Sequence, residues 1–222
     1  MNLVEYADRE MLAIDVANML ASELKSCLLH HDHASFAVPG GTTPGPIFDA
    51  LCGADLEWDR VHVMPTDERW VPETDERSNA RLIKQRLLVD HARAARFCPL
   101  YADGDVDAVL PELASALEAE MPLSVLLLGM GSDMHTASLF PGADGLERAL
   151  APDAPILLAQ RADQVPELRV TLSASVLEGA MSKHLVIFDD DKRAALERAM
   201  TLPPETAPIN AVLTGMTIHW AE

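Results

Sequence analysis

Cysteine, aromatic side chains and positive charge are all scarce in this chain of 222 residues. Its 3 cysteines form no close pair and no CxxC motif, which excludes a disulfide framework and a zinc knuckle. Its 3 tryptophans are too far apart in sequence to imply a stacking platform. There are 17 Lys and Arg against 35 Asp and Glu, a net charge of −18, which argues against nucleic acid or an anionic membrane as partner. A small anionic ligand is still compatible, because it needs only a few local cations and backbone N–H groups.

Long apolar runs are also missing. The longest, such as residues 125–128, fall far below the roughly 18 residues that suggest a membrane span. The acidic first residues lack the basic and apolar regions of a signal peptide, so we expect a cytoplasmic protein. Apolar residues at 49% and charged residues at 23% are typical of a globular protein with a core. Without a repeat or a low-complexity linker, we expect a single domain over residues 1–222.

Helix and strand patterns alternate along the chain. Apolar residues spaced three and four apart predict a long helix over 12–28, and further helices are expected up to Leu51 and at 78–89, 106–120, 173–180 and 191–200. Strands are predicted at 34–38, 60–64, 123–128, 155–159, 168–172 and 184–188. Segment 123–128 is the most apolar and indicates a central strand buried on both faces. The alternation predicts an α/β fold with an open parallel sheet.

Three of the predicted strands end in loops of small or polar residues. Because ligands bind outside the carboxyl ends of strands in such sheets, these loops should share one rim. The first loop, PGGTT at 39–43, combines glycines, hydroxyls and a following helix N-terminus, which favours an anion such as phosphate. An ordinary strand-to-helix turn is an equal alternative. No GxxxxGK[ST] motif occurs, so a nucleotide P-loop is not supported.

The second loop, TDERW at 66–70, places two carboxylates beside an arginine. Such a group suits acid–base work or an orienting network around an anion, and Arg69 can bind phosphate in a bidentate manner. A solvated charged loop is at least as consistent with the acidic composition. The second charged run, at 75–79, is expected to supply helix capping and local ion pairs.

The third loop, GMGSDMHT at 129–136, follows the most apolar strand. As a dinucleotide fingerprint it is weak, because Met134 occupies the third glycine position. As a catalytic loop it offers His135, whose imidazole suits proton transfer at neutral pH, beside backbone N–H groups for an oxyanion. A structural histidine is the alternative.

Two further patterns are not assigned to chemistry. His30, His31 and His33 lack a ligand at metal-site spacing, and polar residues at a helix C-terminus explain them more simply. No GxSxG motif occurs, so no nucleophilic serine is indicated. We predict no metal and no cofactor.

The three loops together carry a family resemblance. The motifs GGTTP, TDERWVPETDERSN and LLLGMGSDMHTASLFPG, in this order and spacing, resemble the 6-phosphogluconolactonase family over about residues 4–220. The later RVTLS stretch and the lysine opening the helix after HLVIF are similar to that family as well. HTASLFPG is the most specific motif, because the related glucosamine-6-phosphate deaminases continue differently after the histidine.

The resemblance implies a modified Rossmann-like domain, with a mostly parallel sheet flanked by helices. The implied reaction is hydrolysis of 6-phospho-D-glucono-1,5-lactone to 6-phospho-D-gluconate in the oxidative branch of the pentose phosphate pathway, with this phosphosugar lactone as the small-molecule partner and His135 as general base. The implied catalytic residues are His135, Asp67 and Asp133, and the implied substrate-binding residues are Gly40, Gly41, Thr42, Thr43, Arg69, Arg169 and Lys192. A deaminase-like enzyme and a non-catalytic sugar-phosphate-binding protein are the alternatives.

Two departures from the family pattern carry structural expectations. Met134 stands where the family usually has glycine, so a positive φ there would strain the backbone. Asp189, Asp190 and Asp191 precede Lys192, and three carboxylates beside a phosphate site would be costly unless they point away.

Overall fold

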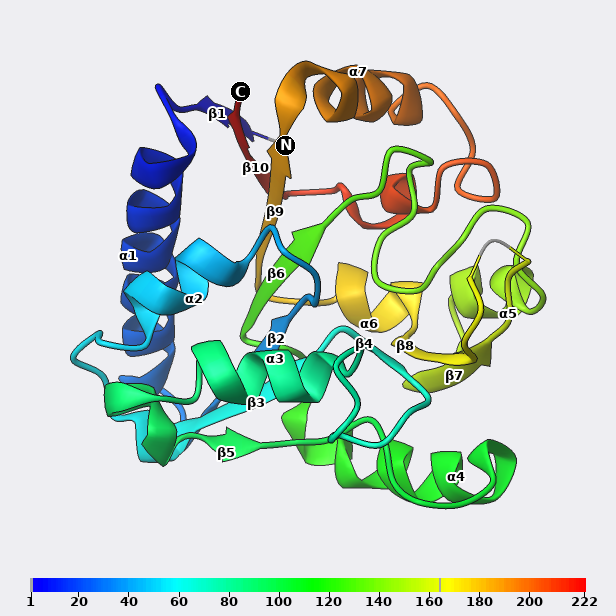
Figure 1. The fold of residues 1–222 in the computed structure, drawn as a ribbon, viewed down its shortest axis with the longest axis horizontal. Helices are drawn as coiled ribbons and strands as arrows, with labels where there is room; N and C mark the ends of the chain where they lie inside the picture. Colours follow the sequence, from blue (N-terminus) through cyan, green and yellow to red (C-terminus); the bar gives the residue numbers. More distant parts are fainter. Residues whose placement is uncertain (1, 164) are drawn as a thin grey trace.

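The structure is a computed structural model that describes residues 2–163 and 165–222 (Figure 1). It is an α/β fold with a 7-stranded sheet and a 3-stranded sheet, so the predicted fold class is confirmed. The strands are β1 (Asn2–Glu5), β2 (Ala34–Val38), β3 (Val61–Pro65), β4 (Asp67–Arg69), β5 (Arg96–Phe97), β6 (Val125–Gly129), β7 (Leu157–Gln160), β8 (Arg169–Leu172), β9 (Ser182–Phe188) and β10 (Thr217–Ala221). The α-helices are α1 (Arg9–Leu28), α2 (Gly45–Leu51), α3 (Asn79–Arg86), α4 (Val106–Ala116), α5 (Leu146–Leu150), α6 (Ala174–Glu178) and α7 (Asp189–Ala199). The 3₁₀ helices are η1 (Trp58–Arg60), η2 (Asp90–Ala94), η3 (Glu118–Glu120) and η4 (Pro208–Val212).

The large sheet is parallel throughout and has the strand order β1-β10-β9-β6-β2-β3-β5. From β2 the chain moves outward through β3 to β5, then returns to β6 on the other side of β2 and moves outward through β9 to β10. The switch in direction therefore falls between β2 and β6. In open α/β sheets, the carboxyl ends of strands at such a switch point open onto a crevice where ligands bind.

The large sheet is buried on both faces. Phe36 and Val38 of β2 join a core with α1, α2 and α3, whereas Ala37 joins the opposite core with α4, α5, α6 and α7. Successive side chains of a strand point to opposite faces, so each face needs its own apolar residues. Burial on both sides explains the unbroken apolar run of β6, which the sequence predicted as a central strand.

Helix α1 forms along the stripe that the sequence predicted. Asp8 caps its N-terminus by accepting a hydrogen bond from the Met11 N–H at 2.7 Å. Leu12, Leu20 and Leu24 are fully buried on one side, where the helix packs against α2 and the sheet. Within residues 2–163 and 165–222, no helix has both the length and the apolar character needed to cross a membrane.

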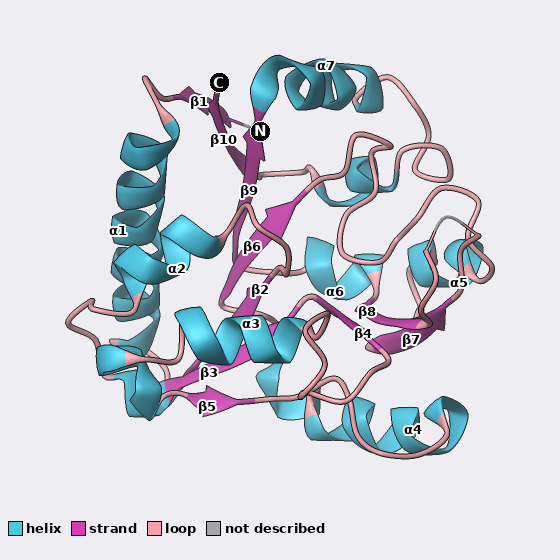
Figure 2. Ribbon diagram, in the orientation of Figure 1, coloured by secondary structure: helices cyan, strands magenta, loops and turns pink. Residues whose placement is uncertain are grey.

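The predicted strands over 155–159 and 168–172 exist as β7 and β8, but they do not join the large sheet. In a small sheet beside it, β8 pairs antiparallel with both β4 and β7 (Figure 2). The sequence analysis missed β4 because it has 3 residues and the polar sequence DER. It also missed the pairing of β1 with β10, which joins the two ends of the chain at the edge of the sheet (Figure 1).

Candidate active site

A cavity of about 380 Å³ lies at the switch point between β2 and β6. The structure brings the three predicted loops together there. Its lining includes residues 39–44 after β2, Asp67 and Arg69 after β3, and residues 129–131 with His135 after β6. All the predicted site residues except Asp133 line this cavity.

The loop after β2 depends on both of its glycines. A Cβ on Gly40 would lie 1.8 Å from Oδ1 of Asn79, so no side chain fits between the loop and α3. Gly41 has φ +84°, a left-handed conformation that glycine adopts without strain. Within the described chain, the backbone N–H groups of Gly41, Thr42 and Thr43 donate to no protein acceptor. The loop therefore presents several hydrogen-bond donors to the cavity.

Two arginines face each other across the small sheet at the cavity. Arg69 of β4 is directly opposite Arg169 of β8, and both line the cavity. In the described chain, the Nε atoms of both guanidinium groups are buried without a hydrogen-bond partner. Burial, followed by the opposing attraction of Asp67 and the repulsion of Arg69, leaves the pKa of Arg169 below its ordinary value. Cations whose buried Nε donors are unused create a site that favours an anion.

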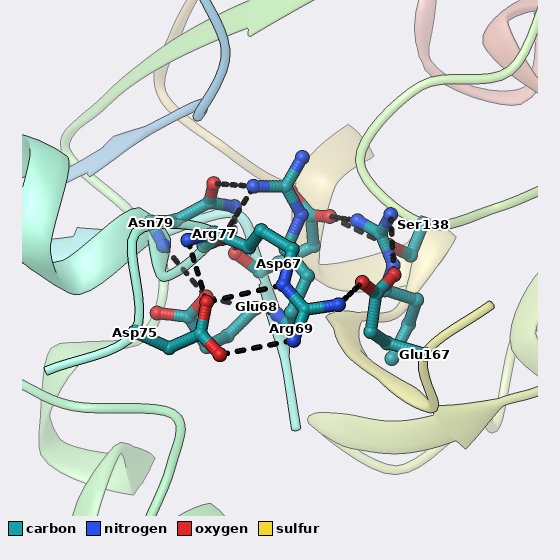
Figure 3. A network of polar contacts seen from close by, with 9 residues as sticks. Asp67, Glu68, Arg69, Asp75, Arg77, Asn79, Ser138 and Glu167 are labelled. Atoms are coloured by element: carbon teal, nitrogen blue, oxygen red, sulfur yellow. Dashed lines mark hydrogen bonds and ion pairs between the residues drawn. The ribbon is translucent and has the colours of Figure 1, made fainter. Parts of the chain in front are cut away.

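Neighbouring polar groups hold these arginines in place. The Arg69 guanidinium donates to the Arg77 carbonyl at 2.6 Å and to Asn79 Oδ1 at 3.1 Å (Figure 3). Asp67 accepts a hydrogen bond from the Ser138 hydroxyl at 2.5 Å, and its Oδ2 lies 3.7 Å from Arg169 Nη1. Asp67 is therefore placed to orient Arg169. The sequence analysis did not identify Asn79 and Ser138 as site residues.

Glu68 does not join Asp67 at the cavity, although the two are adjacent in sequence. Its carboxylate accepts the backbone N–H groups of Asn79 and Ala80 at the start of α3, each at 2.7 Å, and that of Arg69 at 2.8 Å. Burial raises the pKa of Glu68 against the effect of these donors. Adjacent strand residues point to opposite faces, so the two carboxylates separate. Of the two alternatives for this loop, the arrangement favours an orienting network, in which Asp67 faces Arg169 and Glu68 anchors α3.

The third loop holds a histidine and a carboxylate together at the cavity. His135 Nδ1 lies 2.5 Å from Asp133 Oδ1, and its ring lies against Phe140 with centroids 4.6 Å apart. Burial opposes ionisation of Asp133, but the hydrogen bond and charge of His135 outweigh it and lower the pKa of that carboxyl. With Nδ1 engaged, Nε2 is the ring nitrogen left for chemistry. The ring packs over Gly131, where a Cβ would lie 2.2 Å from it.

The two departures from the family pattern have clear structural outcomes. Met134 does have a positive φ, +68°, as expected for a position that usually holds glycine. Lys192 lines the cavity, whereas Asp189 pairs with Arg9, and Asp190 and Asp191 are exposed. In the chain as described, the cavity lining contains none of these three aspartates. They occupy the first turn of α7, where the helix dipole favours negative charge.

The charge run at 75–79 acts as the sequence predicted. Ser78 caps α3 by accepting a hydrogen bond from the Arg81 N–H at 3.2 Å. Asp75 and Arg77 form an ion pair at 2.9 Å. Asn79 has a further contact that the capping pattern does not reveal, because its amide oxygen binds Arg69 at the cavity.

The sequence model described as glucosamine-6-phosphate isomerases/6-phosphogluconolactonase matches residues 7–220. The chain therefore belongs to this family. It is 40% identical to a 6-phosphogluconolactonase of Mesorhizobium japonicum, covering 97% of this chain and 93% of that one, and 39% identical to a 6-phosphogluconolactonase of Pseudomonas aeruginosa, covering 92% and 88%. The crystal structure of a 6-phosphogluconolactonase from Shewanella baltica superposes with a TM-score of 0.96 at 29% identity, covering 100% of this chain and 98% of the other.

Proposed function

We propose that this protein is a 6-phosphogluconolactonase that hydrolyses 6-phospho-D-glucono-1,5-lactone to 6-phospho-D-gluconate, a reaction of the pentose phosphate pathway. One observation carries the proposal above the others. A histidine–carboxylate pair and two arginines whose buried Nε atoms have no hydrogen-bond partner in the described structure line or border the same cavity. The near full-length similarity to proteins named 6-phosphogluconolactonase supports the same activity.

The arginine side of the cavity is proposed to bind the phosphate. Arg69 and Arg169 each have a buried Nε without a partner in the described structure, and Lys192 adds a third cation to the lining. Guanidinium groups match phosphate oxygens in a bidentate manner, so these donors find acceptors only when the substrate arrives. Asp67 and Asn79 keep the guanidinium groups oriented. The free N–H groups of the Gly41–Thr43 loop are proposed to bind sugar or carbonyl oxygens.

The chemistry is proposed to run through the neutral imidazole of His135. With the Nδ1–H donating to Asp133, Nε2 takes a proton from a water molecule as its oxygen bonds to the lactone carbonyl carbon. The carbonyl oxygen becomes an oxyanion, which loop N–H groups stabilise. When the bond from the carbonyl carbon to the ring oxygen breaks, the imidazolium returns the proton to that ring oxygen. The product carboxylic acid then loses a proton to solvent, and His135 is neutral again.

The carboxylate of Asp133 has a positioning role in this scheme. It fixes the imidazole tautomer in which Nε2 is the acceptor, and it stabilises the imidazolium that forms during the reaction. General-base assistance is worth about 10²–10⁴-fold. That is sufficient for a lactone that also opens in water without a catalyst.

The test is proton release after freshly generated 6-phosphogluconolactone is added to the purified protein, measured against the rate without protein. We expect a saturable rate far above that background. A background rate combined with saturable lactone binding would identify a sugar-phosphate-binding protein instead. Ammonia release from glucosamine 6-phosphate would identify a deaminase, and we expect none.

A further inference from the structure

A second histidine–carboxylate cluster lies at the opposite end of the sheet from the cavity. His33 immediately precedes β2, His62 is in β3, and Glu120 is in η3 shortly before β6. His62 Nδ1 lies 2.9 Å from Glu120 Oε1, and His33 Nε2 lies 3.2 Å from Glu120 Oε2. The two imidazole rings stack with centroids 4.3 Å apart and an angle of 18° between their planes. Three distant segments thus bring three potential ligands together at the amino ends of central strands.

We propose that His33, His62 and Glu120 form a binding site for a divalent transition-metal ion such as Zn²⁺. Two imidazoles and a carboxylate are a ligand set that zinc uses with a fourth position open to water. The ligand atoms all lie within 4.8 Å of one another. Zn–N and Zn–O bonds of about 2.0–2.1 Å in a tetrahedral site place neighbouring ligand atoms about 3.3 Å apart. His62 Nδ1 and His33 Nε2 lie 3.0 and 3.2 Å from the same carboxylate oxygen, Oε2 of Glu120, which is close to that spacing.

The surroundings of the cluster fit an ion that enters from solvent. A cavity of about 250 Å³ opens beside it, lined by residues that include His33, Ser35, Glu120 and Ser124. The His33 side chain is 35% exposed, so it can move toward an ion, whereas the Glu120 side chain is only 2% exposed. A partly exposed ligand provides the entry path and a buried one provides the fixed anchor.

Backbone contacts hold the buried ligand in position. The Glu120 carbonyl accepts a hydrogen bond from the Ser35 hydroxyl at 2.8 Å, and that hydroxyl in turn accepts the Ser124 N–H at 3.0 Å. These bonds tie the end of η3 to the starts of β2 and β6. Outer contacts of this kind orient ligands and raise metal affinity.

The charge of Glu120 gives a physical reason for an ion. A buried carboxylate is costly unless it is paired; in the described structure the two imidazoles pair with it, and the Cys98 thiol also lies close enough to interact with its charge. A divalent cation would bind the ring nitrogens that now face the carboxylate. The ion would connect three segments of the chain and stabilise the fold. Because the cluster lies at the far end of the sheet, this inference is independent of the proposed lactonase activity.

Isothermal titration with Zn²⁺ tests the site. We expect one equivalent to bind the wild-type protein, and Co²⁺ to give visible absorption bands of a nitrogen- and oxygen-ligated ion. We expect His33→Gln, His62→Gln and Glu120→Gln to lose this equivalent. His31→Gln is the matched control, because His31 is exposed at the same cavity. His135→Asn separates the site from the Asp133–His135 pair, and should still bind.

Thermal unfolding gives a second readout that does not depend on activity. At one hundred times Kd, Zn²⁺ should raise the Tm of the wild-type protein by about 5–10 °C and leave that of His33→Gln unchanged. Circular dichroism and lactone turnover of each variant check that it is folded. No binding by the wild type, equal binding by His33→Gln, or loss of binding only in His135→Asn would overturn the proposal.

Discussion

Strand β6 has a histidine–carboxylate pair near each of its ends, and the two pairs have different environments. Near its amino end, His62 and Glu120 have side chains that are 14% and 2% exposed. Beyond its carboxyl end, His135 and Asp133 are 31% and 45% exposed, in a loop where Met134 has a left-handed backbone. The chemical groups are the same, so the end of the sheet determines whether the pair meets a substrate.

The polar groups around the two pairs differ as well. At the amino end, Ser35 and Ser124 satisfy each other and the Glu120 backbone. At the carboxyl end, the Nε donors of Arg69 and Arg169 are buried without partners in the described structure. Unsatisfied buried donors reduce stability unless a ligand supplies acceptors. The carboxyl end therefore has unused donors for an anionic ligand, whereas the serine donors at the amino end are already satisfied within the protein.

The largest effect should come from exchanging the histidine at the carboxyl end. His135→Asn removes the proposed base and should lower kcat by about 10²–10⁴-fold, with KM little changed, because Nε2 acts in the transition state. His33→Gln changes a histidine at the other end and should leave kcat within about twofold of wild type. Steady-state lactone hydrolysis, corrected for the uncatalysed rate, measures both. Near-wild-type kcat in His135→Asn would remove this residue as the base.

The next effect should come from the arginines with unused donors. Arg169→Lys keeps the positive charge but loses the planar fork, and should raise KM by about 10–100-fold with a smaller change in kcat, since charged hydrogen bonds contribute about 1.5–3 kcal/mol. Arg77→Lys is the matched control, because Arg77 is exposed and pairs with Asp75. Its KM should stay close to wild type. Equal KM values for the two variants would place the phosphate elsewhere.

A third group of histidines, buried between β9 and β10, should affect stability and not turnover. His219 is fully buried and bonds the Tyr6 hydroxyl at 2.9 Å and His184 at 3.0 Å. Burial, and then the charge of His184, lowers the pKa of His219 to about 4 from an ordinary 6.5. The unfolded chain thus binds more protons between these values, so stability falls as the pH drops through this window.

Urea unfolding at pH 7 and pH 5 measures this loss. The wild-type protein should lose about 2 kcal/mol from this histidine over that interval, and His219→Gln should lose correspondingly less. His91→Gln, at an exposed histidine, should behave as wild type. The same pH dependence in all three proteins would contradict a buried neutral His219.

The parts of the fold that the sequence predicted are those with a strong periodic pattern. The strand predicted at 34–38 is β2 with the same bounds, because burial on both faces requires an unbroken apolar run. The pairing of Arg69 with Arg169 could not be predicted from a periodic pattern in the sequence. β4 is short and polar, and 100 positions separate the two residues in sequence, so nothing in the sequence shows that β4 pairs with β8. Only the folded chain shows that they are opposite each other.

Some features of the candidate site were also predicted from the sequence, and others were not. The loops could be located from the sequence because they follow predicted strands, and the family resemblance supplied roles for their residues. Ser138 was missed because it acts on Asp67, which is 71 residues earlier in the chain. Asn79 was assigned to helix capping, and its bond to Arg69 depends on the path of the loop between them. The separation of Glu68 from Asp67 could have been predicted from the sequence, because adjacent residues of a strand point to opposite faces.

The smallest effect should come from substitutions of Met134. Its φ of +68° agrees with the expectation for a position where the family usually has glycine. Met134→Gly relieves the left-handed strain but loses packing and makes the unfolded chain more flexible, so the free energy of unfolding should change by less than about 1 kcal/mol. Met134→Val places a β-branched side chain in the same conformation and should lower it by about 1–2 kcal/mol. Urea unfolding compares the two variants. A valine variant as stable as wild type would show that residue 134 is not held in a left-handed conformation, and the loop that presents His135 would then need another path.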